Sequence, residues 1–459
     1  MMTTHAPEQL HNHVPRTIAA AAVLLLFSAG PASAADVKDA MDGWSATGGN
    51  YAASGSIDLR SARRQEVKLP AEPRWITGFS TGEALRWYVL LSDERVMQIE
   101  VDRRGRVVTE MSAYRYPQES KLVLQPGGDD GGAVSSDNPL FPPSAYHGNF
   151  DSPPTPLPGG GYAAIDRHGR LRVVRGGQSY VVEGIRPLPD SQLLVDPDGR
   201  LLVLTDPDRR YTHGILGDER EAAGFAVVDT GGGTRPPRVE AHTLINEIAQ
   251  RADSGTEALV AETLQPLWGN LSGDGRVEEL FLTVSGLRKG ARLWLINTGG
   301  SLLAESTPIG RGFRWIHRLA YAPLGPDGEM ELAAVRTPHI GGVLEYYRLQ
   351  DDRLKRVHAE RGFSTHRIGS RNLATALAGD FLNLGRAGLL LPLQSMRELA
   401  VVYRTSRGAD LLHRIPLSGA MSTNLAHMAH QGRTALALGT AKKRVHLFYS
   451  PPRGSSATQ

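Results

Sequence analysis

Short apolar runs separated by glycine- and proline-containing turns alternate along most of the chain. Typical runs are Trp87–Leu91, Leu201–Leu204, Leu280–Val284, Leu389–Leu391 and Leu399–Tyr403. With one or two flanking residues, each has the length of a β-strand and is too short for a helix. The pattern predicts an all-β protein, in which only 218–223 and 244–251 are short helical candidates.

A shared turn motif joins several of these runs. An apolar residue precedes Asp or Asn, and Gly follows three positions later, at Asp102–Gly105, Asp166–Gly169, Asp196–Gly199 and Asn297–Gly300. The Asp or Asn side chain can accept hydrogen bonds from nearby backbone, and Gly supplies a positive φ, so each motif predicts a tight β-hairpin. We interpret the four copies as marks of a repeated unit.

Glycine-containing turns set a longer period in the C-terminal half. They align at Asn270, Pro323, Asp380 and Gly432, with spacings of 53, 57 and 52 residues. Units of about 50 residues without helical periodicity predict four-stranded blades of a β-propeller. The chain length allows seven blades, or eight, between residues 71 and 450.

Three segments fall outside this rhythm. Residues 125–160 are rich in Pro, Gly, Asp and Ser and predict a loop-rich insertion. We expect 35–70 to be a loosely ordered N-terminal segment and 451–459 a disordered tail.

The N-terminus has the features of a signal peptide. Arg16 precedes the apolar run Thr17–Phe27, and the small residues Ala32–Ala34 follow Gly30 and Pro31. The run is shorter than the roughly 20 residues that span a bilayer. The pattern predicts cleavage after residue 34 and a periplasmic or secreted mature chain without a transmembrane segment. A retained membrane anchor is the alternative.

Composition narrows the classes of function. The chain has no Cys, which excludes disulfides and a thiol nucleophile. Lys and Arg total 51 against 48 for Asp and Glu, without a long basic run, so we expect no nucleic-acid partner. The sequence also lacks a P-loop, a Rossmann fingerprint, a G-x-S-x-G elbow and an H-E-x-x-H motif.

The segment Asn270–Leu280 (NLSGDGRVEEL) resembles the loop of FG-GAP and VCBS propeller repeats, and the likeness extends over 256–447. The resemblance implies a β-propeller and a calcium site formed by Asn270, Ser272, Asp274 and Glu278 with the Arg276 carbonyl. Calcium prefers six to eight oxygen ligands. Asn270 and Ser272 replace stronger ligands of the family pattern, so weak calcium binding and a turn without calcium both remain open. The segments 211–218, 337–342 and 366–372 are similar to exported bacterial propellers, a likeness that implies no activity.

Polar side chains beside glycine turns form the candidate site. His213, His339 and His366 each precede such a turn, and Arg314 and Arg371 occupy equivalent positions in successive units. Equivalent positions of successive blades surround the propeller axis, which predicts a ring of His, Arg and Asn. The candidates are His213, Asp218, Arg314, His317, His339, His366, Arg371, Asn372 and Asn424. Such a ring suits an anionic or carbohydrate ligand, although buried polar residues also satisfy backbone groups between blades.

Two functions follow from these observations. The first is an exported binding or scaffolding module for a protein, a glycan or a cell-envelope component, because no catalytic motif is present. The alternative is a hydrolase or lyase that uses the His/Arg cluster on an anionic or polymeric substrate. Propellers host both classes, so the sequence leaves open whether the protein is an enzyme.

Overall fold

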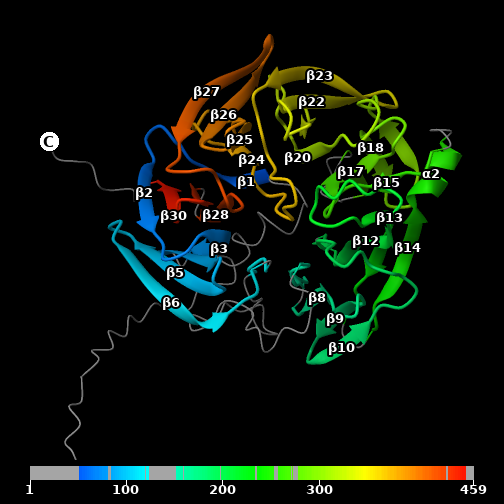
Figure 1. Cartoon of the computed structure of the whole chain (residues 1–459), viewed down its shortest axis with the longest axis horizontal. Helices are drawn as coiled ribbons and strands as arrows, with labels where there is room; N and C mark the ends of the chain where they lie inside the picture. Colours follow the sequence, from blue (N-terminus) through cyan, green and yellow to red (C-terminus); the bar gives the residue numbers. More distant parts are fainter. Residues whose placement is uncertain are drawn as a thin grey trace, which may run out of the picture.

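The described strands divide into seven four-stranded blades arranged in a ring around a central axis (Figure 1), and pairings between neighbouring blades join several of them into larger sheets. The computed structural model describes residues 51–80, 84–118, 120–123, 151–158, 160–196, 198–232, 235–252, 257–269, 271, 278–430 and 433–450. Each blade is antiparallel, with its first strand nearest the axis. The fold is therefore an all-β propeller, as predicted, and the described residues form seven blades.

Six blades consist of four strands in chain order. Blades 1 to 3 are β3 (Pro73–Ser80), β4 (Ala84–Leu91), β5 (Arg95–Asp102), β6 (Val107–Arg115); β7 (Thr155–Pro156), β8 (Tyr162–Ile165), β9 (Leu171–Arg175), β10 (Gln178–Val181); and β11 (Leu194–Val195), β12 (Arg200–Asp208), β13 (Glu221–Asp229), β14 (Arg238–Leu244). Blades 4 to 6 are β16 (Leu267–Gly269), β17 (Glu279–Ser285), β18 (Arg292–Asn297), β19 (Leu302–Glu305); β20 (Ile316–Ala322), β21 (Glu331–Arg336), β22 (Val343–Gln350), β23 (Arg353–Arg361); and β24 (Leu377–Asp380), β25 (Gly388–Pro392), β26 (Glu398–Thr405), β27 (Gly408–Pro416). Helix α2 (Ile245–Arg251) and strand β15 (Val260–Ala261) connect blade 3 to blade 4.

Blade 7 combines both ends of the described chain. Its inner strands are β28 (Ala426–His430), β29 (Arg433–Thr440) and β30 (Arg444–Tyr449), and its outer strand is β2 (Arg63–Lys68). We expected 35–70 to be loosely ordered, but 63–68 pair antiparallel with β30, with Arg63 opposite Tyr449. The pairing covers an edge of β30 that would otherwise leave its backbone groups unpaired.

Strand β1 (Tyr51–Ser56) lies between blades 6 and 7 on their inner side. It runs parallel to β24, the innermost strand of blade 6, and lies on the axial side of that strand (Figure 1). Ser56 also pairs with Arg433 of β29. The N-terminal segment thus passes along the inner side of blades 6 and 7 before it reaches the outside of blade 7.

Both faces of a blade are apolar because each blade packs against two neighbours. In β17, Leu280 and Leu282 pack toward blade 3, whereas Phe281 packs toward blade 5. This two-sided burial explains why the strands appear in the sequence as continuous apolar runs instead of alternating ones.

The spacing of about 50 residues between glycine-containing turns marks the blades, as predicted, but the Asp/Asn-x-x-Gly hairpin motif does not. The turns at 270, 323, 380 and 432 fall between the first and second strands of blades 4 to 7. By contrast, 102–105 and 297–300 join third to fourth strands, 166–169 joins second to third, and 196–199 joins first to second. The interpretation of these hairpins as marks of a repeated unit is therefore wrong.

Local turn chemistry accounts for the recurrence of the hairpin. Asp102 Oδ1 accepts hydrogen bonds from the Arg104 and Arg106 amides, both at 2.8 Å, and Gly105 has a φ of +83°. Asn297 Oδ1 accepts the Ser301 amide in the same way, at 2.8 Å. The motif is selected wherever a tight turn is needed, whatever its position in a blade.

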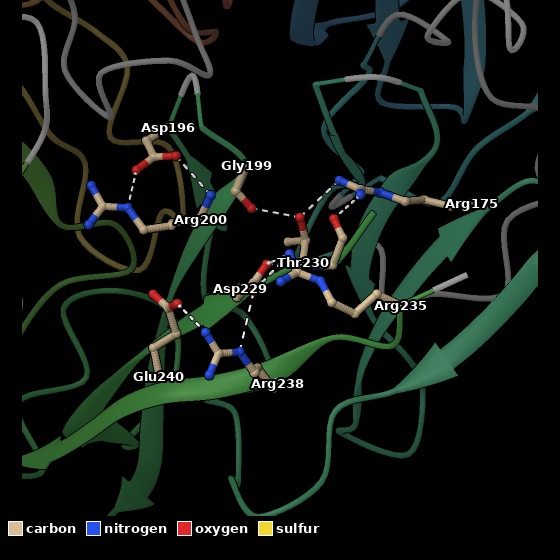
Figure 2. A network of polar contacts seen from close by, with 10 residues as sticks. Arg175, Asp196, Gly199, Arg200, Asp229, Thr230, Arg235, Arg238 and Glu240 are labelled. Carbon is tan, nitrogen blue, oxygen red and sulfur yellow. Dashed lines mark hydrogen bonds and ion pairs between the residues drawn. The ribbon is translucent and has the colours of Figure 1, made fainter. Parts of the chain in front are cut away.

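A polar seam joins blades 2 and 3 beside one of these hairpins (Figure 2). Arg175 of β9 reaches across to the Thr230 hydroxyl at 2.9 Å and to the Gly231 carbonyl. The Thr230 hydroxyl in turn donates to the Gly199 carbonyl at 2.6 Å. Polar side chains at a blade boundary can therefore be wholly structural.

Three predicted segments are not covered by this description. Residues 1–34 and 451–459, and most of 125–160, lie outside the described residues. Within the described ranges, no helix has the length and apolar character needed to cross a membrane.

Candidate functional site

All but one of the candidate residues lie in loops on a single face of the propeller. Connections between consecutive blades, and those between second and third strands, emerge on the same side, which we call the loop face. Asp218 and His213 lie in the β12–β13 loop and His339 in the β21–β22 loop. Three interblade connections hold the remaining loop candidates, which are Arg314, His366, Arg371, Asn372 and Asn424. His317 is the exception, within β20.

Three histidines surround Trp315 on this face. The ring centroids of His317, His339 and His366 lie 5.0, 6.3 and 4.8 Å from that of Trp315. His366 Nε2 donates to the Ser370 carbonyl at 2.7 Å, which leaves its Nδ1 to accept from His339 Nε2 at 3.0 Å. Burial lowers the pKa of His366 to about 3 and lowers the pKa of the other two rings as well. The three rings are therefore neutral at physiological pH and supply no positive charge.

Beside them, His213 contacts a buried carboxyl group. Its Nδ1 hydrogen-bonds to Glu262, and the Ser285 hydroxyl donates to the same carboxyl group. The His213 ring stacks on Phe313 with centroids 5.1 Å apart. Burial raises the pKa of Glu262, and the contact with His213 opposes that rise.

Arg371 ties the loop before blade 6 to loops on the opposite side of the ring. Its guanidinium lies 2.9 Å from Asp190 and 3.4 Å from Asp218. The Gly369 amide also donates to the Ile215 carbonyl at 2.9 Å. Loops from blades 2, 3 and 6 therefore meet over the axis.

A cavity of about 270 Å³ opens on the loop face among blades 1, 6 and 7. Four cationic side chains line it, which are Arg74, Lys121, Arg367 and Arg371. The Lys121 ammonium lies 5.7 Å from the centre of the Trp75 ring, and Arg74 lies 3.4 Å from Glu72. We call this cavity the basic pocket.

Three of the predicted residues have other roles. Arg314 is exposed, and its Nε donates to the Arg311 carbonyl at 3.3 Å. The Asn372 side chain accepts the Ala374 amide at 2.9 Å and stabilises a turn. The Asn424 amide group bridges the backbone N–H and carbonyl of Ile76, both at 2.8 Å, and so joins blade 7 to blade 1. Of the predicted ring, His317, His339 and His366 lie together around Trp315, and Arg371 reaches Asp218 from the opposite side of the axis.

The predicted calcium loop falls mainly outside the described residues. Asn270, Ser272, Asp274 and Arg276 are not described, and Glu278 is exposed. In the part of the chain that is described, no group of three or more His, Asp or Glu side chains could hold a metal ion. Calcium binding stays a prediction.

Sequence reasoning missed two buried acids and three of the four cationic residues of the basic pocket. Glu221 and Glu262 adjoin the apolar runs of β13 and β15, and an acid next to a fully buried strand is a usable signal. Arg74 and Lys121 carry no such signal, because closure of the ring brings them to the pocket.

Comparisons with known proteins do not assign a family. No protein-family model matches the chain, and no curated protein sequence matches it. Among solved structures, the chain is similar to BBS1N in complex with ARL6DN, with 12% identity, 85% of this chain and 96% of that chain covered, and a TM-score of 0.39. It is also similar to Raptor from Chaetomium thermophilum, with 10% identity, 85% of this chain and 29% of that chain covered, and a TM-score of 0.41. Likeness at this level carries no argument about ligand or activity.

Proposed function

We propose that the protein is an exported binding module that holds an anionic glycan of the cell envelope in the basic pocket. The observation that supports this is the convergence of four cationic side chains on one cavity of about 270 Å³. Guanidinium groups bind carboxylates and phosphates through paired hydrogen bonds. Arg371 and Arg74 already have acidic partners, so the exposed Arg367 supplies much of the attraction.

The composition of the lining fits a sugar that carries an acidic group. Ser370, Asn372 and Thr423 offer hydroxyl and amide groups, and Met396 and Met421 add apolar surface. The volume lies just below the range typical of sites for drug-sized ligands, which suits one or two sugar units or the end of a polymer. Export rests on the signal-peptide pattern of residues 1–34.

Titration calorimetry with matched acidic and neutral oligosaccharides tests this proposal. Each exposed arginine that contacts the anion contributes a charge-assisted hydrogen bond of about 1.5–3 kcal/mol. Arg367→Ala and Arg74→Ala should therefore each weaken binding of the acidic sugar by roughly 10- to 150-fold. Arg407→Ala is the matched control, because Arg407 is an exposed arginine on the opposite face.

Two results would contradict the proposal. One is equal affinity for the neutral sugars, which would remove the role of charge. The other is wild-type affinity in both pocket variants, which would place the ligand elsewhere.

The contact between His213 and Glu262 favours a second candidate function, acid–base catalysis on such a glycan. A carboxyl group on Nδ1 orients an imidazole and leaves Nε2 to accept a proton. The His213 side chain is 16% exposed, whereas Glu262 is fully buried. His213 would act as the general base of a hydrolase or lyase, and Glu262 as its positioning residue.

Turnover assays on acidic polysaccharides separate the two functions. If the protein is an enzyme, His213→Gln should lower kcat by at least about 100-fold, the usual contribution of a general base. Glu262→Gln should lower kcat by a smaller factor, because it weakens the contact that orients His213. His339→Gln, a substitution in the neighbouring neutral cluster, is the control. Unchanged turnover in His213→Gln would eliminate this mechanism.

A further inference from the structure

A small cavity lies between blades 4 and 5, beside Trp315, and shares no lining residue with the basic pocket. Its volume is about 20 Å³, enough for one particle of about the size of water. Thr263, Gln265, Thr283, His317 and Arg318 supply its polar lining. We call it the Arg318 cavity.

Arg318 differs from the other buried arginines in its partners. Four described arginines are less than 10% exposed, namely Arg86, Arg292, Arg318 and Arg404. Arg86 lies 2.7 Å from Glu100, and Arg292 lies 3.0 Å from Glu257. Arg404 lies 3.0 Å from Glu331. Among the described residues, no carboxylate lies within ion-pair distance of Arg318. A buried cation without a counter-charge is costly.

The hydrogen bonds of Arg318 all go to neutral oxygens. Its Nη1 donates to the Phe281 carbonyl at 2.7 Å, and its Nη2 donates to the Gln265 carbonyl at 2.6 Å and to the Thr263 hydroxyl at 2.5 Å. Nε donates to the Thr283 hydroxyl at 3.1 Å. Four of the five guanidinium N–H groups are thereby used, and one on Nη1 remains.

A second donor lines the same cavity. His317 is 3% exposed, and its Nδ1 is held by the Thr365 hydroxyl at 2.8 Å. Its Nε2 has no well-formed hydrogen bond among the described residues, although the Leu373 backbone, which also lines the cavity, lies close to the ring. With Nδ1 accepting from Thr365, Nε2 carries the proton. The cavity therefore combines an unneutralised positive charge with two unused N–H groups.

We propose that the Arg318 cavity binds a monovalent halide, chloride under ordinary conditions, as a structural counter-ion between blades 4 and 5. Chloride accepts hydrogen bonds from several directions and is only a little larger than water. A phosphate or carboxylate ligand is too large for this volume. The ion would neutralise Arg318 and accept a hydrogen bond from His317 Nε2. A water molecule could accept the hydrogen bond but would leave the charge of Arg318 unbalanced.

Crystals grown in sodium bromide provide the direct test, because bromide replaces chloride and scatters anomalously. We expect an anomalous peak in the cavity, within hydrogen-bonding distance of Arg318 Nη1 and His317 Nε2. A cavity without an anomalous peak, filled by water or empty, would overturn the proposal. This test uses the unaltered protein and does not depend on whether any variant folds.

Thermal unfolding in different salts at equal ionic strength gives the second test. Once chloride exceeds its dissociation constant, each tenfold rise in chloride should multiply the folded-to-unfolded ratio by about tenfold, and gluconate should have no such effect. Arg318→Met should abolish the chloride dependence, whereas Arg86→Met should retain it. Equal responses to chloride and gluconate in the wild type would refute the halide site.

Discussion

Glu221 shows how much a single buried acid can constrain this protein. The residue is 1% exposed, and neither carboxyl oxygen has a hydrogen-bond partner among the described residues. Burial raises its pKa well above the ordinary value of 4.5, and the nearby acids Glu262 and Asp190 raise it further. Glu221 is therefore protonated in the folded state at pH values where it is ionised in the unfolded chain.

The raised pKa makes stability depend on pH in a defined direction. Below pH 4.5 both states are protonated and folding has no protonation cost at this residue. As the pH rises toward the folded pKa, the unfolded state gains stability by ionising, so the protein loses stability. Glu221→Gln should therefore match wild type near pH 4 and exceed its melting temperature at pH 7.5, by scanning fluorimetry across this range.

Glu331→Gln is the matched control. Glu331 is equally buried but lies 2.7 Å from Arg348 and 3.0 Å from Arg404. Its replacement leaves the buried Arg404 without a counter-charge and should lower stability at neutral pH. If Glu221→Gln also lowers the melting temperature at pH 7.5, the protonated state assigned to Glu221 is wrong.

At the scale of elements, the strands were predictable and their grouping was predictable only in part. Apolar runs such as Leu280–Val284 gave the strands directly, because both sides of a blade are buried. The turns near 323 and 380 predicted the blade period, because they recur at one position in blades 4 to 7. The Asp-x-x-Gly hairpins gave a wrong prediction of the repeated unit, because their sequence indicates the geometry of a tight turn and not a position in a blade.

Strand β2 was missed because nothing local distinguishes it. Its sequence, RRQEVK, is polar, and only Gln65 and Val67 are partly buried. Its place is fixed by pairing with β30, which lies at the other end of the chain. A strand defined by so distant a partner has no signature within its own window of sequence.

Closure by β2 predicts a measurable loss of stability. Val67 packs against the apolar cluster between blades 1 and 7, so Val67→Asp would place a charge against apolar side chains. We expect a loss of about 1–3 kcal/mol in the free energy of unfolding, measured in urea. Lys68→Asp, at the exposed neighbouring position, should change stability by less than about 0.5 kcal/mol. Equal effects of the two substitutions would mean that β2 contributes little to closure.

At the scale of the whole molecule, the sequence predicted which loops carry the candidate residues, but not how their side chains are oriented or which residues they contact. Arg314 and Arg371 do occupy equivalent interblade loops, as their spacing predicted. Their orientations differ, since one is exposed and the other is held between Asp190 and Asp218. The basic pocket joins Arg74 to Arg367, a proximity that follows only from ring closure.

The same closure means that the ring cannot be completed in the order in which the chain is synthesised. Residues 63–68 are synthesised long before their partners at 444–449. Contacts between such distant residues carry a large loop-closure entropy and form slowly. Until then, blade 7 lacks its outer strand and blade 1 lacks one neighbour, so the nascent chain exposes apolar surface throughout its synthesis. The final step of folding is also the one that protects this protein from aggregation.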